Sequence, residues 1–169
     1  MSDIDDGVQF VIPLALQAEV KRQVPIRGKG GSVVSTRRVD KPEAAQFKAQ
    51  ARVFAIEAMR EAGLPPYDEP VGVVIHFFRA KPKSQRKHDV WPHTRPDLDN
   101  YEKLAFDAMQ GVCYVDDARI CRKVSDKQFV ECAALPYEHI HVQIYPLIPG
   151  YPYRRYDEAP PEAQETGLC

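Results

Sequence analysis

The segment "EPVGVVIHFFRA", residues 69–80, is the feature that most restricts how this chain can fold. Its apolar residues do not alternate with polar ones, so a strand built from it would need burial on both faces. Such a segment is typical of an interior strand with a neighbour on each side. The rest of the chain must therefore supply further strands.

Other segments provide candidates for those strands. Residues 8–16, "VQFVIPLAL", and residues 139–147, "HIHVQIYPL", place apolar side chains at every second position, which is the pattern of a half-buried strand. Residues 118–130 are a further expected strand. Residues 21–41 contain glycines and many cations, so they predict a loop or an irregular hairpin.

Two helices are predicted from apolar residues at helical spacing. The first runs from residue 42 to about residue 62, with Asp40 as its expected N-cap, Glu43 three residues on and Gly63 after its end. The second begins around residue 97 or 98 and closes at Gly111. Together these elements predict one α/β-type domain with about four strands and two main helices.

The length of the chain allows a single hydrophobic core. It has 169 residues, of which 44% are hydrophobic. We expect residues 1–148 to form the domain and residues 149–169, rich in Pro and Glu, to form a mobile tail. No apolar run approaches the ~20 residues of a membrane helix. The N-terminus has no signal-peptide pattern. The four cysteines form no C-x-x-C pair, so we expect free thiols and a cytoplasmic location.

Charge is unevenly distributed along the chain, although the formal net charge is only −1. Residues 21–96 contain sixteen Lys or Arg against seven Asp or Glu, and the remainder contains seven against seventeen. A face that binds a polyanion and a separate acidic site would produce this segregation. Chance placement of charges on solvated faces would also produce it.

The acidic residues gather in one motif, "RPDLDNYEKLAFDAM" (residues 95–109), which is followed by "YVDDARI". Asp97 and Asp99 can converge if Asp97 is extended and Asp99 lies in the first helical turn, near the positive end of the helix dipole. Lys103 follows at i+4 on the same face. A turn at Gly111 could return Asp116 or Asp117 to this cleft. Such oxygen ligands suit Mg²⁺ or Mn²⁺.

Simpler interpretations of the same residues remain open at this point. Asp97 could be a plain N-cap, and Asp99 with Lys103 an ordinary surface ion pair. An EF-hand is excluded, because the sixth loop position counted from Asp97 is Glu102 where glycine is required.

The residues 95–120, "RPDLDNYEKLAFDAMQGVCYVDDARI", resemble the central motif of the RusA-type Holliday junction resolvases. The resemblance is strong over residues 69–130, moderate over the basic N-terminal part and absent after about residue 148. It implies that Asp97, Asp99 and Asp117 bind the metal and that Lys103 is catalytic. Asp116 would be a neighbouring acid without an assigned role.

The family also implies the fold and the activity. The expected architecture is a mixed β-sheet in a homodimer, encoded by a bacterium or a phage. The expected activity is Mg²⁺-dependent endonucleolytic nicking of two opposed strands at a four-way DNA junction, in recombination and repair. Two alternatives stay open: a metal-dependent nuclease acting on flaps or forks, and a non-catalytic protein that binds DNA junctions.

Two basic segments are candidates for contacts with DNA phosphates. The side chains that we expect to make these contacts are Arg27, Lys29, Arg37, Arg38, Lys83, Arg86 and Lys87. Trp91, in the second segment, could stack on an exposed base or pack beneath its loop. His139 and His141 share a strand face, but without a third ligand they predict a surface or an interface rather than a zinc site.

Overall fold

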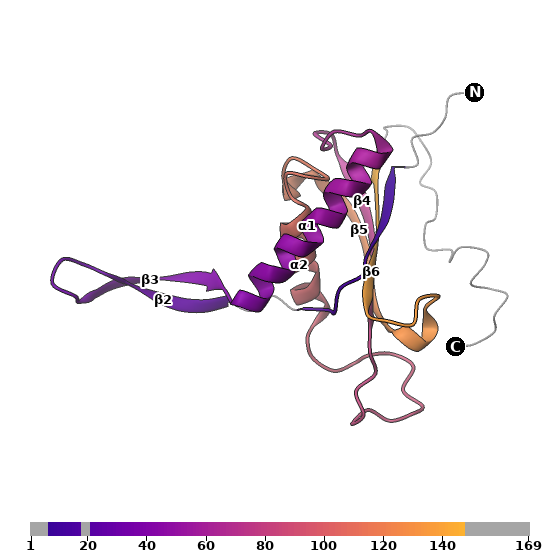
Figure 1. Ribbon diagram of the computed structural model, residues 1–169, viewed down its shortest axis with the longest axis horizontal. Coiled ribbons are helices and arrows are strands. Elements are labelled where there is room, and N and C mark those ends of the chain that lie inside the picture. The colour runs from indigo at the N-terminus through magenta and orange to yellow at the C-terminus, as the bar shows by residue number, and fades with distance from the viewer. Residues whose placement is uncertain (1–6, 18–20, 148–169) are drawn as a thin grey trace.

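A four-stranded mixed sheet forms the centre of the protein (Figure 1). The computed structural model describes residues 7–17 and 21–147. The sheet has the order β1-β6-β4-β5, and its strands are β1 (Val8–Ile12), β4 (Val71–Arg79), β5 (Ile120–Phe129) and β6 (His139–Pro146). Only β4 and β5 are parallel; β6 pairs antiparallel with β1 and β4. The α+β class, with a mixed sheet and two main helices, is confirmed.

The interior position predicted for residues 69–80 is also confirmed. β4 has a paired strand on each side, and the side chains of Val73, Ile75 and Phe77 are fully buried on one face. Val74 is buried on the other face. A run of apolar residues without alternation therefore predicted a strand that is paired on both sides and has buried side chains on both faces, although β6, whose residues alternate, also lies between two strands.

Helices α1 (Pro42–Ala62) and α2 (Leu98–Met109) lie on the same side of the sheet (Figure 1). Phe47, Ala51 and Ala55 of α1 and Leu104 and Ala105 of α2 belong to the core that packs on it. Small alanine side chains on both helices allow the two to approach each other closely. The core therefore lies between the two helices and this face of the sheet.

Both limits of α1 follow the prediction, but the residue at its N-cap does not. Gly63 closes the helix in the left-handed conformation, with φ of 66°. At the start, Lys41 rather than Asp40 occupies the N-cap position and no side chain caps the helix. The carboxylate of Asp40 instead accepts a hydrogen bond from Lys48 at 2.7 Å. A lysine two turns into the helix thus competes for the expected cap.

The first strand is shorter than predicted. β1 ends at Ile12, because Pro13 has no N–H to continue the ladder. The amide of Leu14 then donates to the carbonyl of Ile12 at 2.9 Å in a tight turn. The expected strand over residues 8–16 is therefore wrong in its second half.

The basic segment 21–41 forms an antiparallel hairpin of β2 (Lys21–Arg27) and β3 (Val33–Asp40), with a shift of register between Ile26 and Arg27, so the predicted irregular hairpin is confirmed. It projects away from the sheet and the helices (Figure 1). Positive φ angles at Gly30 and Gly31 form its turn. The hairpin is the one element whose surroundings are mainly solvent, since nearly all of its described side chains are exposed.

One long connection joins the parallel strands β4 and β5. It contains an exposed loop (residues 80–97), helix α2 and the short helix η1 (Asp117–Arg119). Every predicted metal ligand lies in this connection. Among the described residues no helix is both long and apolar enough to cross a membrane. The predicted tail, residues 149–169, lies outside the described residues.

Candidate active site

The beginning of α2 has the geometry that the sequence predicted. Asp97 is the N-cap residue in an extended conformation, with φ of −72° and ψ of 154°, and Asp99 lies in the first turn. The carbonyl of Asp97 accepts from the amide of Asn100 at 3.2 Å, but its carboxylate makes no capping hydrogen bond. Its main chain begins the helix, and its exposed side chain stays available for another ligand.

Lys103 lies one turn beyond Asp99 and is also exposed. The spacing would permit an ion pair between them, yet none forms, and neither side chain hydrogen-bonds to any residue that the structure describes. The interpretation of Asp99 and Lys103 as a surface ion pair is therefore wrong for this structure. An ammonium group and two carboxylates stand unpaired at the end of the helix where the dipole is positive.

The two acids of "YVDDARI" differ sharply in their contacts. Asp116 is the N-cap of η1: one carboxylate oxygen accepts from the amide of Ala118 at 3.0 Å and the other from Gln110 Nε2 at 3.3 Å. Asp117 is exposed, and its carboxylate has no hydrogen bond or ion pair with a described residue. The carboxylate of Asp116 therefore stabilises the local fold, whereas that of Asp117 makes no such contact with a described residue.

Two cations from the sheet hold the main chain that leads into α2. Lys127 Nζ donates to the carbonyls of Thr94 and Pro96, both at 2.9 Å, and an Arg79 guanidinium nitrogen donates to the carbonyl of Arg95 at 3.2 Å. The peptide between Arg95 and Pro96 is cis. These bonds fix the segment immediately before Asp97 to β4 and β5.

The charges near the start of α2 also change the pKa of Lys127. Burial lowers it, the neighbouring Arg79 charge lowers it further, and the carboxylate of Asp97 raises it, with a net lowering. Asp97 therefore interacts electrostatically with a sheet cation as well as lying at the helix start. Sequence reasoning missed Lys127 and Arg79, although a lysine on the inward face of a predicted strand was a usable signal.

A buried acid fixes the rest of α2 to the sheet. Glu102 is only 7% exposed; one carboxylate oxygen accepts from Lys123 Nζ at 2.6 Å and the other from the Ser125 hydroxyl. Because both partners belong to β5, α2 is held in register along that strand. Glu102 was named in the sequence only to exclude an EF-hand, and its structural role was missed.

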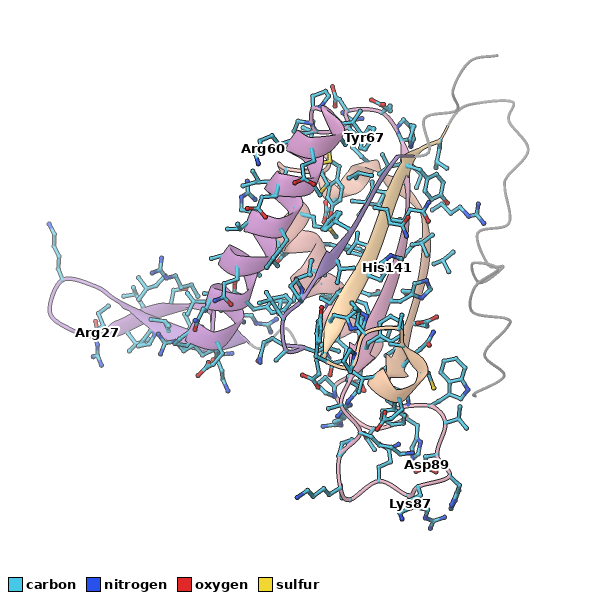
Figure 2. The ribbon with its side chains drawn as sticks, turned by 45° about the vertical axis from the view of Figure 1, so that its right-hand side comes forward. Arg27, Arg60, Tyr67, Lys87, Asp89 and His141 are labelled. Carbon is cyan, nitrogen blue, oxygen red and sulfur yellow. The ribbon has the colours of Figure 1, made fainter. Side chains whose placement is uncertain are left out.

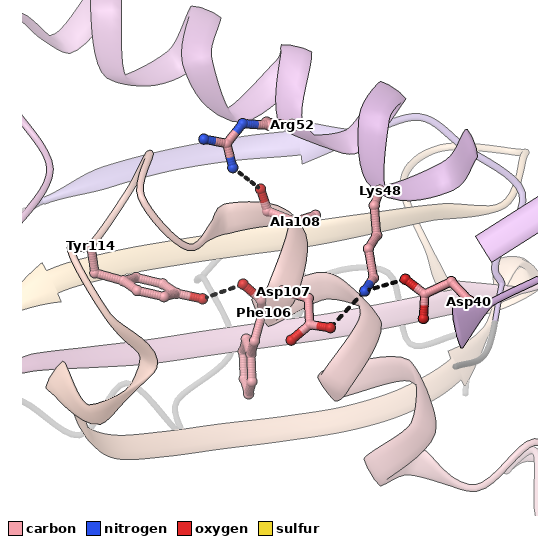
Figure 3. A network of polar contacts seen from close by, with 7 residues as sticks. All are labelled: Asp40, Lys48, Arg52, Phe106, Asp107, Ala108 and Tyr114. Carbon is pink, nitrogen blue, oxygen red and sulfur yellow. Dashed lines mark hydrogen bonds and ion pairs between the residues drawn. The ribbon is translucent and has the colours of Figure 1, made fainter. Parts of the chain in front are cut away.

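A second polar network ties α2 to α1 and to the base of the hairpin (Figure 3). Lys48 of α1 donates to Asp40 at 2.7 Å and to Asp107 of α2 at 2.6 Å. Arg52 donates to the carbonyl of Ala108 at 3.4 Å, and the Tyr114 hydroxyl donates to that of Phe106 at 2.9 Å. Contacts therefore hold α2 at both of its ends: residues 94–96 before it and residues 106–108 in its last turn.

The fit of the predicted ligands to a divalent cation rests on their chemistry. Asp97, Asp99 and Asp117 supply exposed carboxylate oxygens without internal partners, the donor type that Mg²⁺ and Mn²⁺ prefer. In the described ranges, no three His, Cys, Asp or Glu side chains are already close enough together to hold an ion. The donor set thus fits a hard cation, and the ligand role of these residues stays a prediction.

The predicted DNA-binding residues fall into two separate projections. Arg27, Lys29, Arg37 and Arg38 belong to the β2–β3 hairpin, whereas Lys83, Arg86 and Lys87 belong to the loop of residues 80–97. Figure 2 shows Arg27 and Lys87 at two distant extremities. Arg27 is partly committed to the fold, because it donates to the carbonyl of Gly31 at 2.7 Å. The other six side chains make no polar contact with a described residue.

The histidines of β6 do not form a zinc pair with a third ligand. His139 is buried, stacks on Phe78 with ring centroids 4.5 Å apart, and its Nδ1 lies 2.7 Å from the carbonyl of Tyr137. His141 is half-buried; burial lowers its pKa, as do the neighbouring His76 and His139. Among the described residues, no group of three His, Cys, Asp or Glu side chains that could hold a metal ion includes them.

Comparison with models of known protein families matches residues 17–145 to the family described as endodeoxyribonuclease RusA. The matched range covers most of the chain and contains every residue predicted to bind metal or DNA. Comparison with curated proteins found no match.

Proposed function

We propose that this chain, which belongs to the endodeoxyribonuclease RusA family, resolves four-way DNA junctions by paired, symmetric nicking with Mg²⁺. The members of this family are Holliday junction resolvases that act on branched DNA and generally require a divalent metal. Mn²⁺ is the expected substitute. We place the activity in recombination and repair within a bacterial or phage-infected cell.

The observation that carries this proposal is the set of unpaired charges along one connection. Asp97, Asp99 and Asp117 are exposed carboxylates with no side-chain hydrogen bond or ion pair to a residue that the structure describes, and the exposed ammonium of Lys103 has none either. Folding stability gains nothing from leaving four such charges unpaired, whereas binding a metal and a phosphate requires it. Their immediate neighbours Glu102 and Asp116 are instead engaged in the fold.

Each of these residues has a distinct chemical role in the proposal. The three carboxylates would hold the ion, which when bound lowers the pKa of water and neutralises charge on the phosphate. Lys103 places a positive charge beside the scissile phosphate and stabilises the oxygen that leaves. Lys127 and Arg79 position Asp97 by holding residues 94–96. Asp116 positions Asp117 through the cap of η1.

Junction resolution further requires two related sites, because two strands of like polarity are cut. We therefore propose that the protein acts as a homodimer, each subunit supplying one acidic site. Light scattering of the full chain with and without a junction gives the stoichiometry. Two subunits per junction are expected, and a persistent single subunit in the cleaving complex would contradict the dimer.

The function is tested with the full chain and three labelled substrates: a four-way junction, a flap and a linear duplex. Each is incubated with Mg²⁺, with Mn²⁺ or with EDTA. We expect paired nicks at symmetric positions in the junction only when a metal is present. The Asp99→Asn variant should retain junction binding and lose at least about a hundredfold in nicking rate, because the ion loses a charged ligand.

The outcomes separate the alternatives. Preferential cutting of the flap would replace the junction assignment by a nuclease of other branched DNA. Tight junction binding without nicking under any metal would leave a non-catalytic binding protein. Nicking by the Asp99→Asn variant at the normal rate would remove Asp99 from the site.

A further inference from the structure

The loop of residues 80–97 is organised by its own hydrogen bonds. Lys81 Nζ crosses the loop and donates to the carbonyls of Lys87 at 2.8 Å and Asp89 at 2.7 Å. Main-chain turns close at Gln85 and at Asp89, whose amides donate to carbonyls three residues earlier at 2.9 and 3.1 Å. The loop is therefore a folded projection with a defined shape (Figure 2).

Trp91 is fixed through its main chain while its side chain points outward. Its carbonyl accepts from the amide of His93 at 2.9 Å and from Gln85 Nε2 at 3.4 Å, and the next residue, Pro92, is buried. Yet the Trp91 side chain is 58% exposed, and the neighbouring Val90 is 49% exposed. The indole makes no hydrogen bond or ring contact with any residue in the described part of the chain. Of the two interpretations from the sequence, packing beneath the loop is wrong.

A large apolar ring held in water by an ordered main chain indicates a ligand that covers it. The charges on the same loop indicate the class of that ligand. Lys83, Arg86 and Lys87 are exposed on the same loop and make no contact with a described carboxylate. An aromatic face among free cations matches a nucleic acid whose phosphates meet the cations and whose base covers the ring.

The loop also places Trp91 near the reacting phosphate. Five residues lie between Trp91 and Asp97, so their Cα atoms are at most about 22 Å apart even in a fully extended chain. Residues 94–96 are fixed to the sheet by Lys127 and Arg79, so the two positions keep a constant relation. In a closed duplex no base face is accessible to the indole, whereas bases at a branch point can unstack.

We propose that Trp91 is the stacking platform for a base exposed at the branch point, and that it selects branched over linear DNA. This inference rests on the proposed function, since it requires the branch point of a bound DNA junction to lie against the loop that leads into Asp97. Val90 provides further apolar contact to the same base, and the loop cations contact its flanking phosphates.

The test uses the fact that Trp91 is the only tryptophan of the chain. In the Asp99→Asn background, which prevents cleavage, intrinsic fluorescence reports on this one side chain. We expect quenching and a spectral shift on titration with a four-way junction, and little change with a linear duplex of the same arms. A junction carrying 2-aminopurine at the branch point should show the reciprocal change in base fluorescence.

Variants supply the energetic test. Trp91→Ala should weaken junction binding about 5- to 100-fold with duplex binding unchanged, and Trp91→Phe should retain most of the affinity, because stacking needs any aromatic face. Val53→Ala is the matched control, since Val53 is 51% exposed on α1, and it should change nothing. Circular dichroism confirms that each variant is folded.

Equal fluorescence changes with junction and duplex, or normal junction selectivity in Trp91→Ala, would overturn the role of Trp91 and leave the nuclease assignment intact. Failure of the unaltered protein to bind or cut any branched substrate would overturn the proposed function itself. The two failures are therefore distinguishable within one set of measurements.

Discussion

Asp116 and Asp117 are adjacent in the chain, but their carboxylates have opposite surroundings. Asp116 accepts two hydrogen bonds at the start of η1, and Asp117 accepts none from a described residue. We expect Asp117→Asn to lower the nicking rate at least about a hundredfold without changing the free energy of unfolding, because it removes only a ligand charge. Asp116→Ala should lower that free energy by about 1 kcal/mol through loss of a cap.

Single-turnover nicking assays and urea unfolding measure the two effects separately. A large loss of stability in Asp117→Asn would mean that its carboxylate has a structural partner. Normal stability in Asp116→Ala would show that the cap of η1 is dispensable.

At single positions the sequence predicted main-chain geometry better than side-chain contacts. The extended Asp97 and the first-turn Asp99 follow from the position of Asp97 as the N-cap of a helix, which is local information. The capture of Asp40 by Lys48, and of Glu102 by Lys123 and Ser125, depends on residues brought together by folding. Periodicity contains no signal for such partners.

The β2–β3 hairpin is the element whose contribution to DNA binding is easiest to measure. Residues 21–39 contain six Lys or Arg and no Asp or Glu, and Arg37 and Arg38 are exposed on β3. If both contact phosphates, the double variant Arg37→Ala/Arg38→Ala should reduce the slope of log affinity against log salt by about 2. Titration of junction binding over a series of KCl concentrations measures this slope.

Thr36→Ala, on the same strand, is the control and should leave the slope unchanged. An unchanged slope in the double variant would place the DNA away from the hairpin. Arg27→Ala does not serve this purpose, because Arg27 also closes the hairpin turn through Gly31.

At the level of elements, strong local patterns were sufficient and weak ones were not. The alanine-rich stripe and Gly63 gave the limits of α1, and the unbroken apolar run gave β4. The sequence did not decide between a loop and an irregular hairpin for residues 21–41, because the exposed strands of the hairpin have no buried face and so no alternation of apolar and polar residues.

The parts of the molecule are coupled through Lys48. Its ammonium group, 20% exposed, joins the base of the hairpin at Asp40 to α2 at Asp107. Burial alone would lower the pKa of Lys48, but its hydrogen bonds to Asp107 and Asp40 raise it above the ordinary 10.5. A raised pKa means that this contribution to stability is complete below pH 10.5 and is lost as pH rises through the folded-state value.

We therefore expect Lys48→Met to lower the free energy of unfolding by about 1–2 kcal/mol at neutral pH. The loss of stability at alkaline pH should be smaller in the variant than in the unaltered protein, since the titrating group is absent. Urea unfolding at pH 7 and above pH 10.5 measures both. Identical alkaline behaviour of the two proteins would show that Lys48 does not control this dependence.

For the whole molecule, the sequence predicted the class of fold but not its outline. The α+β class follows from element types and order, and the family match supports the same activity. Tertiary packing determines three features that the sequence did not predict. These are the direction of the hairpin, its separation from the loop of residues 80–97 and the exposure of the Trp91 side chain. The charge balance of residues 21–96 predicted one polyanion-binding face, whereas the structure divides these cations among the hairpin, α1, β4 and the loop of residues 80–97.

The connection between β4 and β5 has a consequence for how such a protein can diverge. It contains the candidate catalytic groups and the loop that carries Trp91, yet the two strands that it joins pair along their whole length. The side-chain hydrogen bonds of Lys81 and Gln85 that shape this loop lie within it. Residues 80–93 can therefore be exchanged or extended while Lys127 and Arg79 keep the helix start in place. Changes in this loop, whether engineered or evolved, can thus alter substrate preference without changing the candidate metal-binding and catalytic residues.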